Sequence, residues 1–108
     1  MAPIDFKERL LVGLGGPFPD PGPLNPAVIK TEAKDGYTIN WVTYESEPGH
    51  TIPAILLIPE GANSRNPTPA ICVWHQHNGQ WDIGKTEPAG LAGDPMHHTG
   101  LSLVQNGY

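Results

Sequence analysis

The sequence predicts an α/β chain with an incomplete sheet, made of an antiparallel hairpin, one buried strand and the first helix after that strand. Residues 37–44 alternate between two faces, whereas residues 70–74 form a continuously apolar run. Alternation is typical of a strand buried on one face, and a short apolar run is typical of a strand covered on both faces. One strand of the second kind cannot complete a parallel sheet, so we expect the sheet to be only partly present.

The composition predicts a thin core. The chain has 108 residues, which allows one domain at most. It contains 13 glycines and 13 prolines, and together these make up about a quarter of it, roughly twice the average usage. Ordering such a chain costs conformational entropy that little apolar burial offsets, so we expect much of it to lie against other protein.

Charge and hydropathy exclude several partners. The formal net charge is −5, and the six Lys and Arg residues form no basic stripe, so nucleic acid is not an expected partner. The longest apolar runs, 10–14 and 54–58, are too short to cross a bilayer, and no membrane association is expected. The single Cys72 cannot form an internal disulfide, and the expected compartment is the cytoplasm.

The first 26 residues are expected to form a helix followed by a connector. Apolar residues at Ile4, Leu10, Leu11 and Leu14 have loosely helical spacing, and the glycines that follow would end the helix. Prolines recur through residues 17–26, and their fixed φ and missing N–H groups predict an extended connector. Residues 27–108 are expected to form the sheet-bearing segment.

Three strands with tight turns are expected next. A strand is predicted at 27–32, and Asp35-Gly36 is a hairpin turn signal. Tyr37 to Tyr44 is predicted to be a half-buried antiparallel strand, with Tyr37, Ile39, Trp41 and Thr43 on one face. A turn at 47–50 leads into a second apolar strand at 51–58, which Pro59 ends.

The buried strand and the helix complete the expected elements. Ala70–Trp74 is the buried strand, and it places the Cys72 thiol in the core. After a long polar loop, Asp94 is a suitable N-cap, Pro95 suits the first helical position, and Gly107 would stop the helix.

The loop that follows the buried strand, residues 75–82, is the candidate functional segment. Binding groups collect at the carboxyl ends of strands in open α/β sheets. The backbone N–H groups of Gln76 and His77 could form an oxyanion hole, which stabilises negative charge on a carbonyl oxygen during acyl transfer. Alternatively His75 and His77, two residues apart on an extended segment, could point to one side and bind zinc.

Two further interpretations involve no chemistry. The histidines could satisfy backbone groups and hold a long loop in place, and this is the expected role of His97 and His98, which are adjacent on a helix and cannot face one target. The chain could also be a binding module in which tryptophans contact a ligand. Trp41 and Trp74 are expected in the core, whereas Trp81 in the loop is a candidate pocket wall.

Several segments in order resemble one enzyme family. These are residues 35–39, 44–46, 52–61, 69–70 and 75–80. Together they resemble the N-terminal third of dienelactone-hydrolase-like and acetyl-xylan-esterase-like α/β-hydrolases, over Ile29 to Tyr108. In that family an N–H of the oxyanion hole comes from a loop that often begins His-Gly. His75 matches the histidine, and Gln76 stands where glycine is usual.

The resemblance implies a serine hydrolase whose catalytic triad is absent from this sequence. The family's nucleophile lies in a G-x-S-x-G motif, which none of Ser46, Ser64 and Ser102 occupies. His75 and His77 come before any such nucleophile, so neither suits the triad base. The expected substrate is a small ester-like molecule bound by the full-length enzyme, with no cofactor, and Trp81 is expected to line its pocket.

The expected partner of the chain is either a further C-terminal part or a second copy. We expect these 108 residues alone to have no hydrolytic turnover. A metallohydrolase fragment using His75 and His77, or a noncatalytic binding module, is the alternative function.

Overall fold

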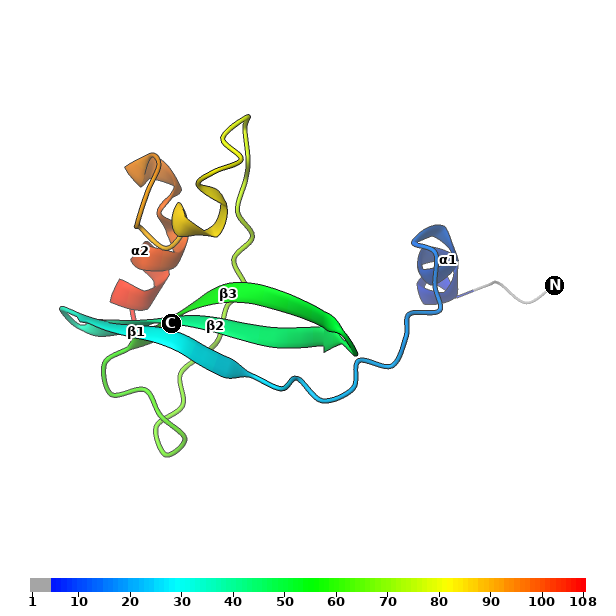
Figure 1. Cartoon of the computed structure of the whole chain (residues 1–108), viewed down its shortest axis with the longest axis horizontal. Coiled ribbons are helices and arrows are strands. Elements are labelled where there is room, and N and C mark those ends of the chain that lie inside the picture. Colours follow the sequence, from blue (N-terminus) through cyan, green and yellow to red (C-terminus); the bar gives the residue numbers. More distant parts are fainter. Residues whose placement is uncertain (1–4) are drawn as a thin grey trace.

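The computed structural model describes residues 5–108 and contains one sheet and two short helices (Figure 1). The elements run in the order α1 (Phe6–Gly13), β1 (Ala27–Lys34), β2 (Tyr37–Glu47), β3 (His50–Pro59), 3-10 turns at Gly84–Thr86 and Pro95–His97, and α2 (Thr99–Gln105). The sheet has three antiparallel strands in the order β1-β2-β3. The predicted α/β fold, in which Ala70–Trp74 forms a strand of a parallel sheet next to the hairpin, is therefore wrong.

The three antiparallel strands form where the sequence predicts them. Lys34 pairs with Tyr37 across the Asp35-Gly36 turn, and Gly36 has the positive φ of +79° that favours glycine there. From Tyr37↔Pro59 to Glu45↔Thr51, β2 and β3 pair without a shift in register. The predicted antiparallel strand is confirmed, with every second residue from Tyr37 on one face. Of these residues only Ile39 is buried, and Trp41, expected in the core, is half-buried.

The predicted buried strand at Ala70–Trp74 does not form. This segment has no regular secondary structure and no backbone hydrogen bond to another part of residues 5–108. Trp74 is 89% exposed and the Cys72 thiol is also exposed, so their predicted burial is wrong. The physical reason is that a strand needs neighbouring strands to pair with its backbone, and none of the three lies beside this segment as a ladder partner.

The predicted helix after Asp94 is divided in two. Asp94 Oδ1 accepts a hydrogen bond of 2.9 Å from the backbone N–H of Met96, and Pro95 follows as expected. However, the turn ends as a 3-10 helix at His97, and α2 begins only at Thr99. The predicted N-cap is confirmed, whereas the predicted single helix is wrong.

The core lies between the sheet and α2. Ile39 is fully buried and pairs with Leu57, and a Cβ placed on Gly100 of α2 would lie 3.4 Å from Leu57 Cδ1. Val104 on the same helix is buried as well. Since few other apolar side chains among the described residues are buried, the thin core expected from the composition is confirmed.

The N-terminal helix stands apart from the rest of the chain. An extended connector separates α1 from the sheet, at the end of the molecule opposite to α2 (Figure 1). No side chain of α1 is buried, and Phe6 and Val12 are both strongly exposed. The connector is attached to the sheet where the N–H of Glu45 donates to the carbonyl of Leu24 at 2.7 Å. Ile4 of the predicted helix lies outside the described residues.

No helix within residues 5–108 has the length and apolarity to cross a membrane.

Candidate functional site

An open apolar cleft runs along β3 and contains part of the predicted functional loop. Its volume is about 890 Å³, and it lies between β3, residues 68–75, residues 81–86 and α2. Figure 1 shows the loop (yellow) extending beyond β3 and folding back toward α2. The apolar side chains that line the cleft include Ile52, Ile71, Val73, Trp74 and Leu103. The cleft is therefore suited to an apolar group rather than to a charged one.

His75 lines this cleft, and its ring lies near Gly84, at the other end of the loop. Its ring Nδ1 donates to the carbonyl of Gln76 at 3.1 Å, and a Cβ on Gly84 would lie 3.7 Å from the ring Cε1. The ring therefore lies beside Gly84, at the start of the 3-10 turn at Gly84–Thr86. The expected role of His75 as a support for the loop stays a prediction.

The side chain of Gln76 is fixed by the buried carboxylate of Glu87. Gln76 Nε2 donates to Glu87 Oε2 at 2.7 Å, and the backbone N–H of Asp94 donates to Glu87 Oε1 at 3.2 Å. Glu87 is only 1% exposed, so the acceptor side of both hydrogen bonds is buried, whereas the Gln76 side chain is half-buried. Gly93 has φ +75°, and a side chain there would collide with this carboxylate. Glu87 thus ties together three segments of the loop region.

The environment of Glu87 favours its ionised form. The hydrogen bond from Gln76 holds the pKa of the Glu87 carboxyl below its ordinary value, and the Asp94 N–H acts in the same direction. Burial of the carboxylate opposes these contributions and raises the pKa. The net direction is downward, so Glu87 is a hydrogen-bond acceptor at neutral pH.

His77 and Trp81 form a stacked pair at the turn of the loop. Their ring centroids are 4.2 Å apart and the rings are inclined by only 10°. The chain reverses between them through Asn78 (φ +36°) and Gly79 (φ +76°). Gln76 is not among the residues with positive φ, so its position does not require glycine.

The backbone N–H groups of the predicted oxyanion hole make no hydrogen bond within residues 5–108. Among residues 5–108, no group accepts a hydrogen bond from the N–H of Gln76 or of His77. His75 and Trp81, on either side of these two residues, both line the apolar cleft. Two unpaired donors therefore lie on the loop between two residues that line the apolar cleft, although Gln76 and His77 are not themselves among its lining residues.

The predicted metal ligands have no third partner. Within the part of the chain that the structure describes, no three His, Cys, Asp or Glu side chains are grouped so that they could hold a metal ion. His77 stacks on Trp81, and His75 is turned toward Gly84. His98 Nε2 lies 3.0 Å from the Ala92 carbonyl, in agreement with the structural role expected for it.

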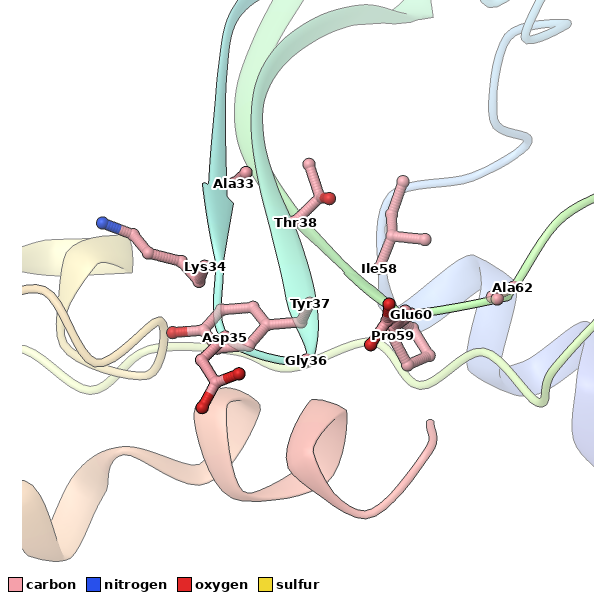
Figure 2. A pocket seen from close by; sticks show the side chains of 11 residues that line it. Ala33, Lys34, Asp35, Gly36, Tyr37, Thr38, Ile58, Pro59, Glu60 and Ala62 are labelled. Atoms are coloured by element: carbon pink, nitrogen blue, oxygen red, sulfur yellow. The ribbon is translucent and has the colours of Figure 1, made fainter.

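A second hollow, of about 440 Å³, lies at the turn between β1 and β2. Figure 2 shows that its charged side chains, on Lys34, Asp35 and Glu60, point in different directions. Catalysis and ion binding require such groups to converge on one point. This hollow is therefore not the candidate site.

Sequence reasoning missed Glu87. The available signal was a lone carboxylate within the Gly- and Pro-rich segment 84–95, which is otherwise poor in acidic residues before Asp94. A single acid in such a segment is unexceptional until the fold shows that it is buried.

Comparisons with protein-family models, with curated proteins and with solved structures found no match to this chain.

Proposed function

We propose that this chain supplies the oxyanion-hole segment of a serine hydrolase that acts on ester or related acyl bonds. The observation that carries the proposal is the pair of unpaired N–H groups on Gln76 and His77, in the loop between His75 and Trp81, which line an apolar cleft. When a serine oxygen attacks a carbonyl carbon, the carbonyl oxygen gains negative charge. Two N–H donors fixed in advance stabilise that charge, and each is worth about 3 kcal/mol.

The hydrogen bond from Gln76 to Glu87 supports this function because it restricts the loop. A donor that is held in place before the reaction does not have to reorganise as the charge develops. Glu87 holds the side chain of Gln76, and the His75 ring contacts Gly84. These interactions therefore restrict the loop near the backbone N–H groups of Gln76 and His77, which would donate to the oxyanion.

The substrate would carry an apolar group beside its ester carbonyl. Trp74 and Trp81 line the cleft together with aliphatic side chains. The nucleophile, the acid and the base would come from another stretch of polypeptide, since none of Ser46, Ser64 and Ser102 lies in a G-x-S-x-G motif. A fluorophosphonate probe should not label the 108-residue chain, and labelling would contradict this assignment.

Binding of n-butylphosphonate tests the proposal directly, because this compound joins a tetrahedral oxyanion to an apolar tail. In ¹⁵N-labelled protein we expect amide shift changes centred on Gln76 and His77 and on the Trp81 indole. Gln76→Ala should weaken binding several-fold, and Glu87→Ala, which also removes the bond from the Asp94 N–H, should weaken it at least as much. The double variant should weaken it no further than Glu87→Ala, because the two residues share one hydrogen bond. Gln80→Ala is the matched control and should bind as the parent chain does.

Two outcomes would count against the oxyanion-hole assignment. Shift changes confined to lysine or arginine side chains would mean that the phosphonate binds by charge alone. Stoichiometric zinc binding that His75→Ala abolishes would favour the metallohydrolase alternative instead.

A further inference from the structure

Asparagine followed by glycine occurs twice in this chain, at Asn78-Gly79 and at Asn106-Gly107. In such a pair the backbone nitrogen of the glycine can attack the side-chain carbonyl carbon of the asparagine, because glycine has no Cβ to obstruct the approach. Asparagine is accordingly one of the heat-labile residues of proteins. Both pairs are exposed to water, so their reactivity depends on whether the reacting atoms already make hydrogen bonds.

The reacting atoms of Asn78-Gly79 are unpaired. Within residues 5–108, the Asn78 side chain makes no hydrogen bond, and neither does the backbone N–H of Gly79. A Cβ placed on Gly79 would meet nothing within 4 Å, so no neighbouring group obstructs the nitrogen. No hydrogen bond of the reacting atoms therefore has to break before the attack.

The same atoms of Asn106-Gly107 are engaged at the end of α2. Asn106 Nδ2 donates to the Ser102 carbonyl at 2.8 Å, and the Gly107 N–H donates to the Val104 carbonyl at 3.1 Å. Both bonds must break before the glycine nitrogen can reach the side chain of Asn106. The two pairs thus share a sequence but differ in how ready their atoms are to react.

The four other asparagines are poorer candidates. Asn25 and Asn66 precede proline, whose nitrogen carries no proton to lose. The Oδ1 atoms of Asn40 and Asn63 accept hydrogen bonds, which hold these side chains in place. Asn78 is therefore the asparagine whose surroundings oppose the reaction least.

We propose that Asn78 is a site of spontaneous deamidation. The Gly79 nitrogen loses its proton to hydroxide and forms a bond to Asn78 Cγ. The Cγ–Nδ2 bond breaks, and the departing nitrogen takes a proton from water and leaves as ammonia, which gives a cyclic succinimide. One water molecule then opens the ring. Opening at Cγ gives aspartate, and opening at the main-chain carbonyl gives isoaspartate. Water is the only co-reactant.

Either product changes the turn between His77 and Trp81. Both add one negative charge, and isoaspartate also lengthens the main chain by one methylene group inside the turn, so the 4.2 Å stack of the two rings no longer fits. The consequence for binding rests on the proposed function. A carboxylate close to the N–H groups of Gln76 and His77 repels an anion there, so the modified loop should bind an oxyanion more weakly.

Peptide mapping by mass spectrometry tests the site. The reduced chain would be incubated at pH 8 and 37 °C, digested at low pH, and searched for replacement of NH₂ by OH at each asparagine. We expect Asn78 to react at least ten times faster than Asn106 in the folded chain. The two rates should converge in concentrated urea, which removes the hydrogen bonds of Asn106. Equal rates in the folded chain, or a faster reaction at Asn106, would overturn the proposal.

Two substitutions separate the modification from its effect on binding. Asn78→Gln is the matched control, because its longer side chain would have to form a larger ring, and it should not be modified at this position. Asn78→Asp carries the charge of the product and should bind n-butylphosphonate several-fold more weakly than Asn78→Gln. Equal affinities of the two variants would refute the effect on binding. A parent chain that does not bind the phosphonate would instead count against the oxyanion-hole assignment, and the rates from peptide mapping would still decide the site.

Discussion

Ionisation of Glu87 is expected to make the stability of the fold around the candidate loop depend on pH. Its carboxylate accepts from Gln76 and from the Asp94 N–H, and these bonds lower its pKa in the folded chain. A carboxyl whose folded pKa is lowered stabilises the fold when it is ionised. That contribution is complete above the ordinary pKa of an unfolded glutamate, about 4.3, and is lost as the pH falls through the lower folded value.

Acid unfolding should therefore differ between the parent chain and Glu87→Gln. We expect the urea midpoint of the parent to fall between pH 5 and pH 3, and that of Glu87→Gln to fall less, as followed by tryptophan fluorescence. Glu32→Gln is the comparison variant. Lys30 and Lys34 also lower the pKa of Glu32, but its carboxylate is exposed to solvent screening, so this variant should flatten the pH dependence less than Glu87→Gln. Identical pH dependence in the parent and in Glu87→Gln would show that the buried carboxylate does not contribute.

Gly93 should be less replaceable than a glycine of similar backbone conformation. A side chain at Gly93 meets the Glu87 carboxylate, whereas one at Gly61 (φ +81°) meets nothing within 4 Å. Gly61→Ala should lower the free energy of unfolding by about 1 kcal/mol through backbone strain alone, and Gly93→Ala by about 2 kcal/mol or more. Urea titration of both variants measures the difference, and equal losses would mean that Glu87 moves aside at no cost.

At the scale of elements, the features that depend on residues close in sequence were predicted correctly, whereas those that depend on distant segments were not. The alternation of residues 37–44 and the Asp35-Gly36 turn depend on neighbours in sequence, and both were predicted correctly. The strand at Ala70–Trp74 was inferred from apolarity alone, but a strand also needs partners for its backbone. The bond between Gln76 and Glu87 could not be predicted either, because it depends on how the long loop folds back.

Hydrogen exchange should distinguish these two kinds of segment. The amide of Ile39 lies in the central strand and is buried, so it should be among the slowest to exchange. Amides of residues 71–74 make no backbone hydrogen bond within residues 5–108, so they should exchange at close to the rate of an unfolded chain. Slow exchange at residues 71–74 in dilute solution would mean that this segment pairs as a strand after all.

At the scale of the whole molecule, the chain is extended rather than compact. Its radius of gyration is 17.3 Å, against about 13 Å for a compact chain of this length. Part of the difference comes from α1 and its connector, which lie away from the sheet (Figure 1). The candidate loop, the cleft and the core are all at the other end of the molecule.

Deletion of residues 1–20 should therefore leave the sheet unaffected. No side chain of α1 is buried, and the contact between Leu24 and Glu45 remains in the shorter chain. We expect the free energy of unfolding to change by less than about 0.5 kcal/mol, and butylphosphonate to bind as before. A loss of several kcal/mol would show that α1 packs against the rest of the chain in solution.

The exposure of Cys72 has a practical consequence. The chain has a single thiol, and it lies on the unpaired segment beside the cleft. One maleimide dye would therefore label one known position, and its emission would report whether the cleft becomes covered when chains associate or a ligand enters. The same thiol could join two chains through a disulfide on storage in air, so labelling and binding experiments need a reducing agent.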